Sequence, residues 1–174
     1  VRQTGFPYSE SAMMDALAHH PEIVRLLIEL FDIRFNPARM AKTDAEQKAA
    51  LQELDWTLGK VVSIDEDRIL RRYRDLIVAT WRTNFYQQAA DGQPKPYLSF
   101  KFNSAAVPEL PLPRPYAEIF VYGLRVEGIH LRGGQVARGG LRWSDRREDY
   151  RTEVLGLMKA QRVKNAVIVP VGSK

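Results

Sequence analysis

Apolar residues recur at intervals of three and four through the first half of the chain, which predicts amphipathic helices. Ser9 is a suitable N-cap for a short helix that ends near His20, and Pro21 suits the first turn of the next helix, which continues to residue 35. The apolar face of this second helix comprises Ile23, Leu26, Leu27, Leu30 and Phe31.

Two further helix starts carry the spacing of a capping box, in which the first side chain and a glutamate three residues later satisfy each other's backbone donors. The pairs are Thr43 with Glu46 and Ser63 with Glu66. The helix after Ser63 has the clearest pattern, with apolar or aromatic positions at Ile69, Leu70, Tyr73, Leu76, Ile77, Thr80 and Trp81. The same helix carries a basic group, which comprises Arg68, Arg71, Arg72 and Arg74. Asp65, Glu66 and Asp67 precede it, so we expect a solvated face with i to i+4 ion pairs.

Beyond Asp91-Gly92 the apolar period shortens towards two, as is typical of strands. Strands are predicted at 96–104, at 117–128, at 129–131 and, closing the chain, at 166–171, with an extended connector over 108–115. A helix is expected to begin at Ser144 or Asp145 and to continue to about Val163. The fold class is therefore α+β, with a helical region at 1–90 and the start of a mixed α/β domain at 91–174.

The composition fits a folded globular protein, because 45% of the 174 residues are hydrophobic and 27% are charged. The absence of cysteine excludes disulfides, thiolate metal sites and cysteine nucleophiles. No apolar run is long enough to cross a membrane and no signal-peptide pattern opens the chain, so we expect a cytoplasmic protein without a membrane partner. Since the sequence lacks an initiator Met and stops just after an apolar run, we also expect a piece of a longer protein.

The net charge of +5 invites a nucleic-acid-binding hypothesis, but the charge is unevenly distributed. Residues 1–130 carry 16 basic and 17 acidic side chains, a net charge of −1, whereas residues 131–174 carry 10 basic and 4 acidic ones, a net charge of +6. Few aromatic residues accompany this basic segment, mainly Trp143 and Tyr150. A basic nucleic-acid-binding module stays open as an alternative, as does a helical interaction module over 1–90 with an exposed apolar face.

Common nucleotide and metal motifs are absent from the sequence. Gly134 and Gly139 have the spacing of a P-loop opening, but Gly140 and Leu141 replace the lysine and hydroxyl residue that such a loop requires. No G-x-G-x-x-G follows a predicted strand, and the three histidines lack a metal-binding spacing. We therefore expect no metal site and no cofactor-binding residues in this chain. His19 and His20 are expected to cap helix carbonyl groups, and His130 is expected to be structural.

Three cations of the basic segment have distinctive positions: Arg138 on a glycine turn, Lys164 at a helix C-terminus and Lys174 on a loop after a strand. In one interpretation Lys164 complements the helix dipole while the arginines pair with Asp145, Glu148 and Asp149. In the other, the three cations converge on a small anionic molecule. The spacing alone does not decide between them.

Residues 139–174 form a tryptophan-containing motif, GGLRWSDRREDYRTEVLGLMKAQRVKNAVIVPVGSK. This motif resembles the signature of the large bacterial NAD-specific glutamate dehydrogenases. The segments RILRRYRDLIVATWRTNFYQ, KPYLSFKFNS and VPELPLPRPYAEIFVYGLRVEGIHLRGG are similar to that family as well. The resemblance implies that the chain ends an N-terminal helical region and begins the substrate-binding side of the catalytic region. It also implies that NAD binds a Rossmann domain further downstream.

A more distant similarity to the K-G-G-x-R and P-x-G-G-x-K-G-G motifs of small glutamate dehydrogenases suggests roles for single residues. By this resemblance Arg138, Gly139 and Gly140 bind a substrate carboxylate, Lys164 is the second substrate cation and Lys174 is the catalytic lysine. VPVGSK is shorter than the corresponding loop, and Arg138 replaces a lysine, keeping the charge in a planar, bidentate form. Arg142 and Lys159 are expected to be structural.

The implied reaction is the oxidation of L-glutamate to 2-oxoglutarate and ammonia, a step of amino-acid catabolism, by a parent expected to be a homo-oligomer. Two carboxylates call for a cation at each end of the substrate. Proton transfer calls for a base, and a lysine that other cations crowd loses its proton more easily. The isolated fragment is expected to be inactive.

Overall fold

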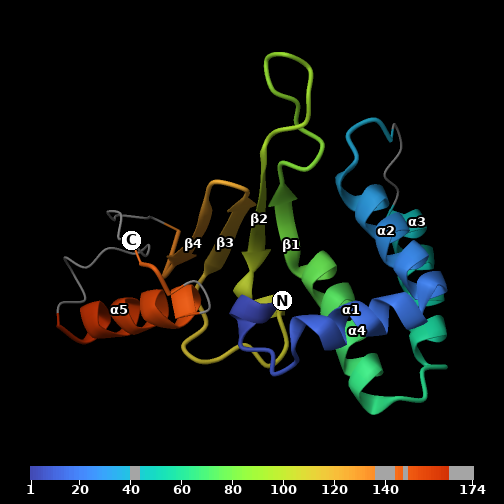
Figure 1. Ribbon diagram of the computed structural model, residues 1–174, viewed down its shortest axis with the longest axis horizontal. Helices are drawn as coiled ribbons and strands as arrows, with labels where there is room; N and C mark the ends of the chain where they lie inside the picture. The colour runs from blue at the N-terminus through green and yellow to red at the C-terminus, as the bar shows by residue number, and fades with distance from the viewer. Residues whose placement is uncertain (40–43, 136–143, 147–148, 165–174) are drawn as a thin grey trace. The chain divides into compact units, whose positions relative to one another are not determined.

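The computed structural model describes residues 1–39, 44–135, 144–146 and 149–164 (Figure 1). The chain divides into two compact units. A helical unit comprises Val1–Arg2 with Pro7–Val78, and a sheet unit comprises Gln3–Phe6 with the residues from Ala79 onward. Helices followed by an antiparallel sheet confirm the predicted α+β class. The predicted boundary at residue 90 stays a prediction.

Four helices form the helical unit after a short 3-10 turn, η1, at Arg2–Thr4. They are α1 (Glu10–His19), α2 (Pro21–Phe35), α3 (Asp44–Leu58) and α4 (Ile64–Ala79). The predicted Ser9 cap is confirmed, because the Ala12 amide donates to the Ser9 hydroxyl at 3.2 Å. The Ser63 hydroxyl likewise accepts from the Glu66 amide at 3.4 Å, whereas the predicted Thr43 cap lies outside the described residues.

The core of this unit is built from leucine and isoleucine on α2, α3 and α4. Its buried members are Ile23, Leu26, Leu27, Leu30, Leu54, Leu58 and Leu70. The predicted apolar face of α2 is therefore confirmed, although Phe31 is only half-buried. Burial of each such side chain contributes about 1.5–3 kcal/mol, which outweighs the weak propensities of the separate helices.

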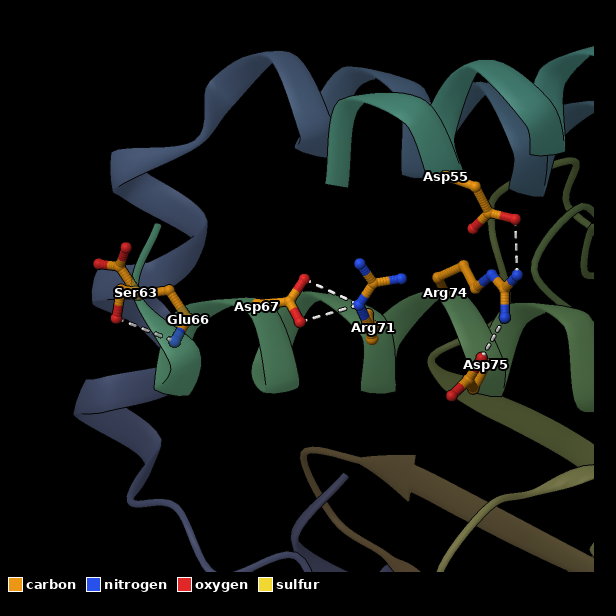
Figure 2. A network of polar contacts seen from close by, with 7 residues as sticks. All are labelled: Asp55, Ser63, Glu66, Asp67, Arg71, Arg74 and Asp75. Atoms are coloured by element: carbon orange, nitrogen blue, oxygen red, sulfur yellow. Dashed lines mark hydrogen bonds and ion pairs between the residues drawn. The ribbon is translucent and has the colours of Figure 1, made fainter. Parts of the chain in front are cut away.

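Arginine side chains on α4 pair with carboxylates of α4 itself and of α3 (Figure 2). Arg71 pairs with Asp67 one turn earlier, at 2.8 Å, which confirms the expected i to i+4 pairing. Arg74 lies 2.7 Å from Asp55 of α3 and 2.7 Å from Asp75. The prediction of a wholly solvated basic face is wrong for Arg72, which is only 5% exposed.

Helix α4 also ends earlier than its apolar pattern predicts. Thr80 and Trp81 continue the helical spacing, yet they belong to strand β1 (Thr80–Thr83), in which Thr80 pairs with Phe102. Cross-strand pairing favours β-branched and aromatic residues, so this long-range partner overrides the local periodicity.

His19, the last residue of α1, and His20, which follows it, have a different partner from the one expected. Instead of helix carbonyl groups, their rings contact the Glu66 carboxylate of α4: His19 Nδ1 lies 2.8 Å from one oxygen and His20 Nε2 lies 2.9 Å from the other. The pairing joins residues more than 40 positions apart, which a local helix-end argument does not anticipate.

The sheet unit contains four strands, β1 (Thr80–Thr83), β2 (Tyr97–Asn103), β3 (Ala117–Gly123) and β4 (Glu127–Arg132), and a 3-10 turn, η2 (Ser104–Ala106). The strands follow the order β1-β2-β3-β4 with antiparallel neighbours. The strands predicted near 96–104 and 129–131 are confirmed. The single strand predicted over 117–128 is wrong, because the chain reverses after Gly123, whose amide donates to the Val126 carbonyl at 2.8 Å. The predicted closing strand at 166–171 lies outside the described residues.

Helix α5 (Tyr150–Lys164) packs against β4. Its buried Val154, Leu155 and Met158 contact Leu131, with Ile129 beside them. The helix begins later than predicted: the Ser144 hydroxyl accepts from the Arg146 amide at 3.2 Å, a local turn that competes with helix formation.

Several large apolar side chains of the helical unit are exposed, namely Met14, Ile28, Trp56, Val62 and Ile64. Exposed apolar side chains on helices are the sign expected of a helical interaction module. That alternative stays a prediction.

Candidate functional site

The residues predicted to carry the chemistry fall mostly outside the described part of the chain. Arg138, Gly139, Gly140 and Lys174 lie outside it, and Lys164 is the last residue of α5. The structure therefore describes the frame of the predicted site, namely strand β4 before the glycine turn and helix α5 after it.

Strand β4 ends at Arg132, next to the glycine turn. An Nη2 hydrogen of Arg132 is donated to the Gln135 carbonyl oxygen, so this side chain holds the first residues of the turn. The Arg132 Nε is buried and has no acceptor among the residues that the structure describes. A buried donor without an acceptor costs free energy.

Helix α5 is attached to the sheet by a buried ion pair. Arg151 donates from Nε and Nη2 to the two oxygens of Glu118 on β3, both at 2.8 Å. The two side chains are 4% and 2% exposed. Gln3 completes this attachment, because its side-chain oxygen accepts from the Arg151 amide at 3.1 Å. A bidentate arginine–carboxylate pair fixes orientation as well as distance, so α5 has a defined direction on the sheet.

A second network lies at the start of α5. Glu153 accepts from the Ser144 hydroxyl at 3.2 Å and pairs with Arg146 at 3.1 Å. The Tyr150 hydroxyl donates to the Ser144 carbonyl at 3.2 Å. Polar side chains of α5 thus hold the segment that leads from the predicted substrate loop into the helix.

The two faces of the sheet differ in chemistry. The apolar face, defined by Phe100, Phe102, Phe120, Ile129 and Leu131, is the one that α5 contacts. The cationic face, defined by Arg82, Lys101, His130 and Arg132, lies on the other side, because alternate residues of a strand point to opposite faces.

The cations of this face affect one another. Burial lowers the pKa of the Lys101 ammonium, and the charges of Arg82 and Arg132 lower it further. Burial likewise lowers the pKa of His130, followed by the charges of Arg132 and Lys101. Both pKa values are lowered because desolvation first, and then repulsion between like charges, disfavours the charged forms.

The sequence alone did not single out Lys101 or Arg132 as functional. Alternation along each strand places residues on a face, but it does not show which residues of separate strands are neighbours. That neighbourhood depends on register, which pairs Lys101 with Ile119 and Ile119 with His130.

Metal and membrane sites are not seen in the part of the chain that the structure describes. None of its histidine, aspartate and glutamate side chains form a group of three able to hold a metal ion. Within the same residues, no helix has the length and apolar character to cross a membrane.

Two models of known protein families match this chain. Residues 53–174 match the model described as bacterial NAD-glutamate dehydrogenase, catalytic domain, and residues 1–37 match glutamate dehydrogenase, helical motif 3. The chain belongs to the bacterial NAD-glutamate dehydrogenase family. The suspected resemblance is thereby confirmed, and all the described strands and α5 lie within the catalytic-domain match.

Several similar proteins are named NAD-specific glutamate dehydrogenase. The chain is 58% identical over 177 residues to the NAD-specific glutamate dehydrogenase of Pseudomonas aeruginosa, 53% identical over 175 residues to that of Halomonas elongata and 52% identical over 178 residues to that of Mycobacterium tuberculosis. Each alignment covers 100% of this chain but 11% of the relative. The NAD-specific glutamate dehydrogenase of Neurospora crassa is 28% identical over 185 residues, which cover 96% of this chain and 17% of that protein.

Proposed function

We propose that this chain is part of an NAD-dependent glutamate dehydrogenase, which oxidises L-glutamate to 2-oxoglutarate and ammonia. The observation that carries the proposal is the catalytic-domain match over residues 53–174. We further propose that the parent is a cytoplasmic homo-oligomer, with a helical region at 1–90 ahead of the mixed α/β region at 91–174.

In the proposed site, Arg138 and Lys164 bind the two substrate carboxylates. Gly139 and Gly140 allow the backbone to approach the substrate closely because they carry no Cβ. Lys174 accepts and returns protons while water adds to the iminium and ammonia leaves. The described frame supports this assignment, since the predicted glycine turn follows β4 and Lys164 ends the helix that Arg151 attaches to the sheet.

NAD supplies the hydride acceptor when it is bound. A dinucleotide site of the Rossmann type needs parallel strands joined through a helix, with a glycine-rich turn at the helix start. The strands described in this chain are antiparallel, so this part offers no such site. We propose that NAD binds another domain of the parent.

Kinetics of the full-length parent test the assignment, with glutamate-dependent formation of NADH as the readout. Lys174→Ala is expected to lower kcat at least about 100-fold, the range that general acid–base catalysis contributes. Arg138→Gln is expected chiefly to raise the KM for glutamate, with the KM for NAD unchanged.

Lys159→Ala is the matched control, because Lys159 is an exposed lysine of the same helix that ends at Lys164. It is expected to behave like the unsubstituted enzyme. Normal kinetics in the Lys174 and Arg138 variants would overturn the site assignment, and a parent without glutamate-dependent NADH formation would overturn the proposed activity.

A further inference from the structure

The cationic face of the sheet carries more positive charge than the proposed substrate site requires. Arg138 and Lys164 already provide one cation for each carboxylate of glutamate, whereas Lys101, His130 and Arg132 belong to strands β2 and β4. No ion pair joins these three side chains to a carboxylate among the residues that the structure describes. Their charge therefore calls for a separate explanation.

Register brings the three side chains together. Lys101, Ile119 and His130 form one row across β2, β3 and β4, and Arg132 lies two residues beyond His130 on the same face. Adjacent strands are about 4.8 Å apart, so Lys101 and His130 are separated by about 10 Å at the backbone. Ile119 lies between them in the row, which leaves an apolar floor flanked by the basic side chains of Lys101 and His130.

Two observations describe the surroundings of Lys101 and Arg132. The Lys101 Nζ lies 5.5 Å from the centroid of the Trp81 ring, which itself stacks at a tilt against Tyr116 at 5.6 Å. An aromatic ring stabilises the ammonium without neutralising it. The buried Arg132 Nε, with no acceptor in the described residues, is a donor ready for an oxygen atom.

The pKa shifts of Lys101 and His130 also favour a bound anion. Burial and the neighbouring arginines lower the pKa of Lys101, and burial with Arg132 and Lys101 lowers the pKa of His130. An anion among these groups would remove the repulsion that disfavours their charged forms. By linkage, binding of the anion must raise both pKa values.

We propose that the cationic face of the sheet, at Lys101, His130 and Arg132, is a binding site for a small oxyanion of the carboxylate or phosphate class, distinct from the glutamate site. Arg132 provides a directional donor, and Lys101 provides a point charge from the opposite side of the Ile119 floor. Arg82, paired with Lys101 in the sheet, adds long-range attraction. The proposal goes beyond the proposed function, and only its separation from the glutamate site rests on that function.

The direct test is a pH titration of the histidine ring signals by NMR on the full 174-residue chain. Titrations in inorganic phosphate and in succinate are compared with sodium chloride at equal ionic strength, because salt screening alone also weakens repulsion. The pKa of His130 is expected to rise by about 1 unit with the oxyanion that binds. A rise with phosphate only or with succinate only identifies the class.

The chain contains its own control. His19 contacts Glu66 in the helical unit, so its titration is expected to be the same in all three salts. Lys101→Gln and Arg132→Gln should each reduce the His130 shift at least several-fold, whereas the exposed Arg114→Gln should leave it unchanged. The salt comparison on the unsubstituted chain already tests whether an oxyanion binds, so a variant that fails to fold does not weaken the test.

Two results would overturn the proposal. One is a His130 pKa that moves no further in phosphate or succinate than in chloride. The other is measured by equilibrium dialysis of the full-length parent with labelled phosphate and labelled succinate. Equal binding of both ions by the parent and by its Lys101→Gln variant would mean that another part of the parent occupies this face. One fewer ion bound per subunit in the variant would support the proposal.

Discussion

Arg151 of α5 donates two hydrogen bonds to Glu118 of β3, and the pair is nearly inaccessible to water. The residues lie 33 positions apart in sequence. Glu118 occupies a position on the apolar face of the sheet, opposite Phe102 on one side and Leu131 on the other. Since this pair fixes α5 on the sheet, it also determines where the C-terminal end of α5, with Lys164, is held.

The first prediction concerns this ion pair. Glu118→Gln keeps the shape of the side chain but leaves the buried guanidinium without a counter-charge, so unfolding should become about 3–5 kcal/mol more favourable. Chemical denaturation of the chain measures this difference. The double substitution Glu118→Leu with Arg151→Met should be less destabilising than Glu118→Gln alone, because no charge then stays buried.

An exposed pair serves as the control for this measurement. Arg25 and Glu29 are separated by 3.2 Å on α2, with side chains 61% and 43% exposed. Water screens such a pair, so Glu29→Gln should change the free energy of unfolding by less than about 0.5 kcal/mol. Equal effects at the two sites would contradict the role assigned to Arg151 and Glu118.

The second prediction concerns Gly123, where the chain leaves β3. A Cβ added here would lie 2.9 Å from the Pro96 carbonyl oxygen and 3.2 Å from the Tyr97 Cβ. Because the first neighbour is backbone, relief requires a shift of β2 against β3, and Gly123→Ala should destabilise the chain by about 1–3 kcal/mol. A Cβ added at Gly128 on β4 would meet open space, so Gly128→Ala should be neutral or slightly stabilising. Thermal unfolding of both variants checks the contrast.

The third prediction concerns pH and the contact of His19 and His20 with Glu66. Hydrogen bonding to Glu66 raises the pKa of His19 above its ordinary value of 6.5, and hydrogen bonding to the two histidines lowers the pKa of Glu66 below its ordinary value of 4.5. The His19 contribution is complete below pH 6.5 and is lost as the pH rises through the raised value. The Glu66 contribution is present above pH 4.5 and is lost as the pH falls through the lowered value.

The contact should therefore stabilise the helical unit most between pH 4.5 and 6.5. Unfolding midpoints of the chain and of its Glu66→Gln variant, measured across pH, should differ most within this window and approach each other at alkaline pH. A difference that stays constant from acid to alkaline pH would show that the ionised contact contributes nothing.

Local patterns were sufficient to predict most helices. Ser9 and Pro21 give start signals whose partners lie within one turn of the chain, so α1 and the start of α2 follow from short-range chemistry. The same kind of argument failed at Thr80 and Trp81. Their helical spacing is real, but a strand partner 22 positions away from Thr80 decides their conformation.

In the candidate site, too, the sequence predicted some features and only the structure revealed others. The motif at 139–174, which contains Lys164 and Lys174, predicted the family, which the catalytic-domain match confirms. The roles of these two residues and of Arg138 stay predictions. Lys101 and Arg132 lie in two separate segments that resemble the family, but the resemblance suggested no role for either residue. Their shared face became visible only when register aligned β2, β3 and β4.

The sequence by itself therefore determined the class of the fold, the starts of α1, α2 and α4, and the family, because each depends on residues near one another in the chain or on an extended motif. Tertiary structure decided the partner of each charged side chain. Arg151 is followed in sequence by acidic and basic residues alike, yet it binds Glu118, and His19 binds Glu66 instead of a nearby carbonyl group. The physical reason is that a charge selects its partner by distance and burial in space, which depend on the packing of distant elements.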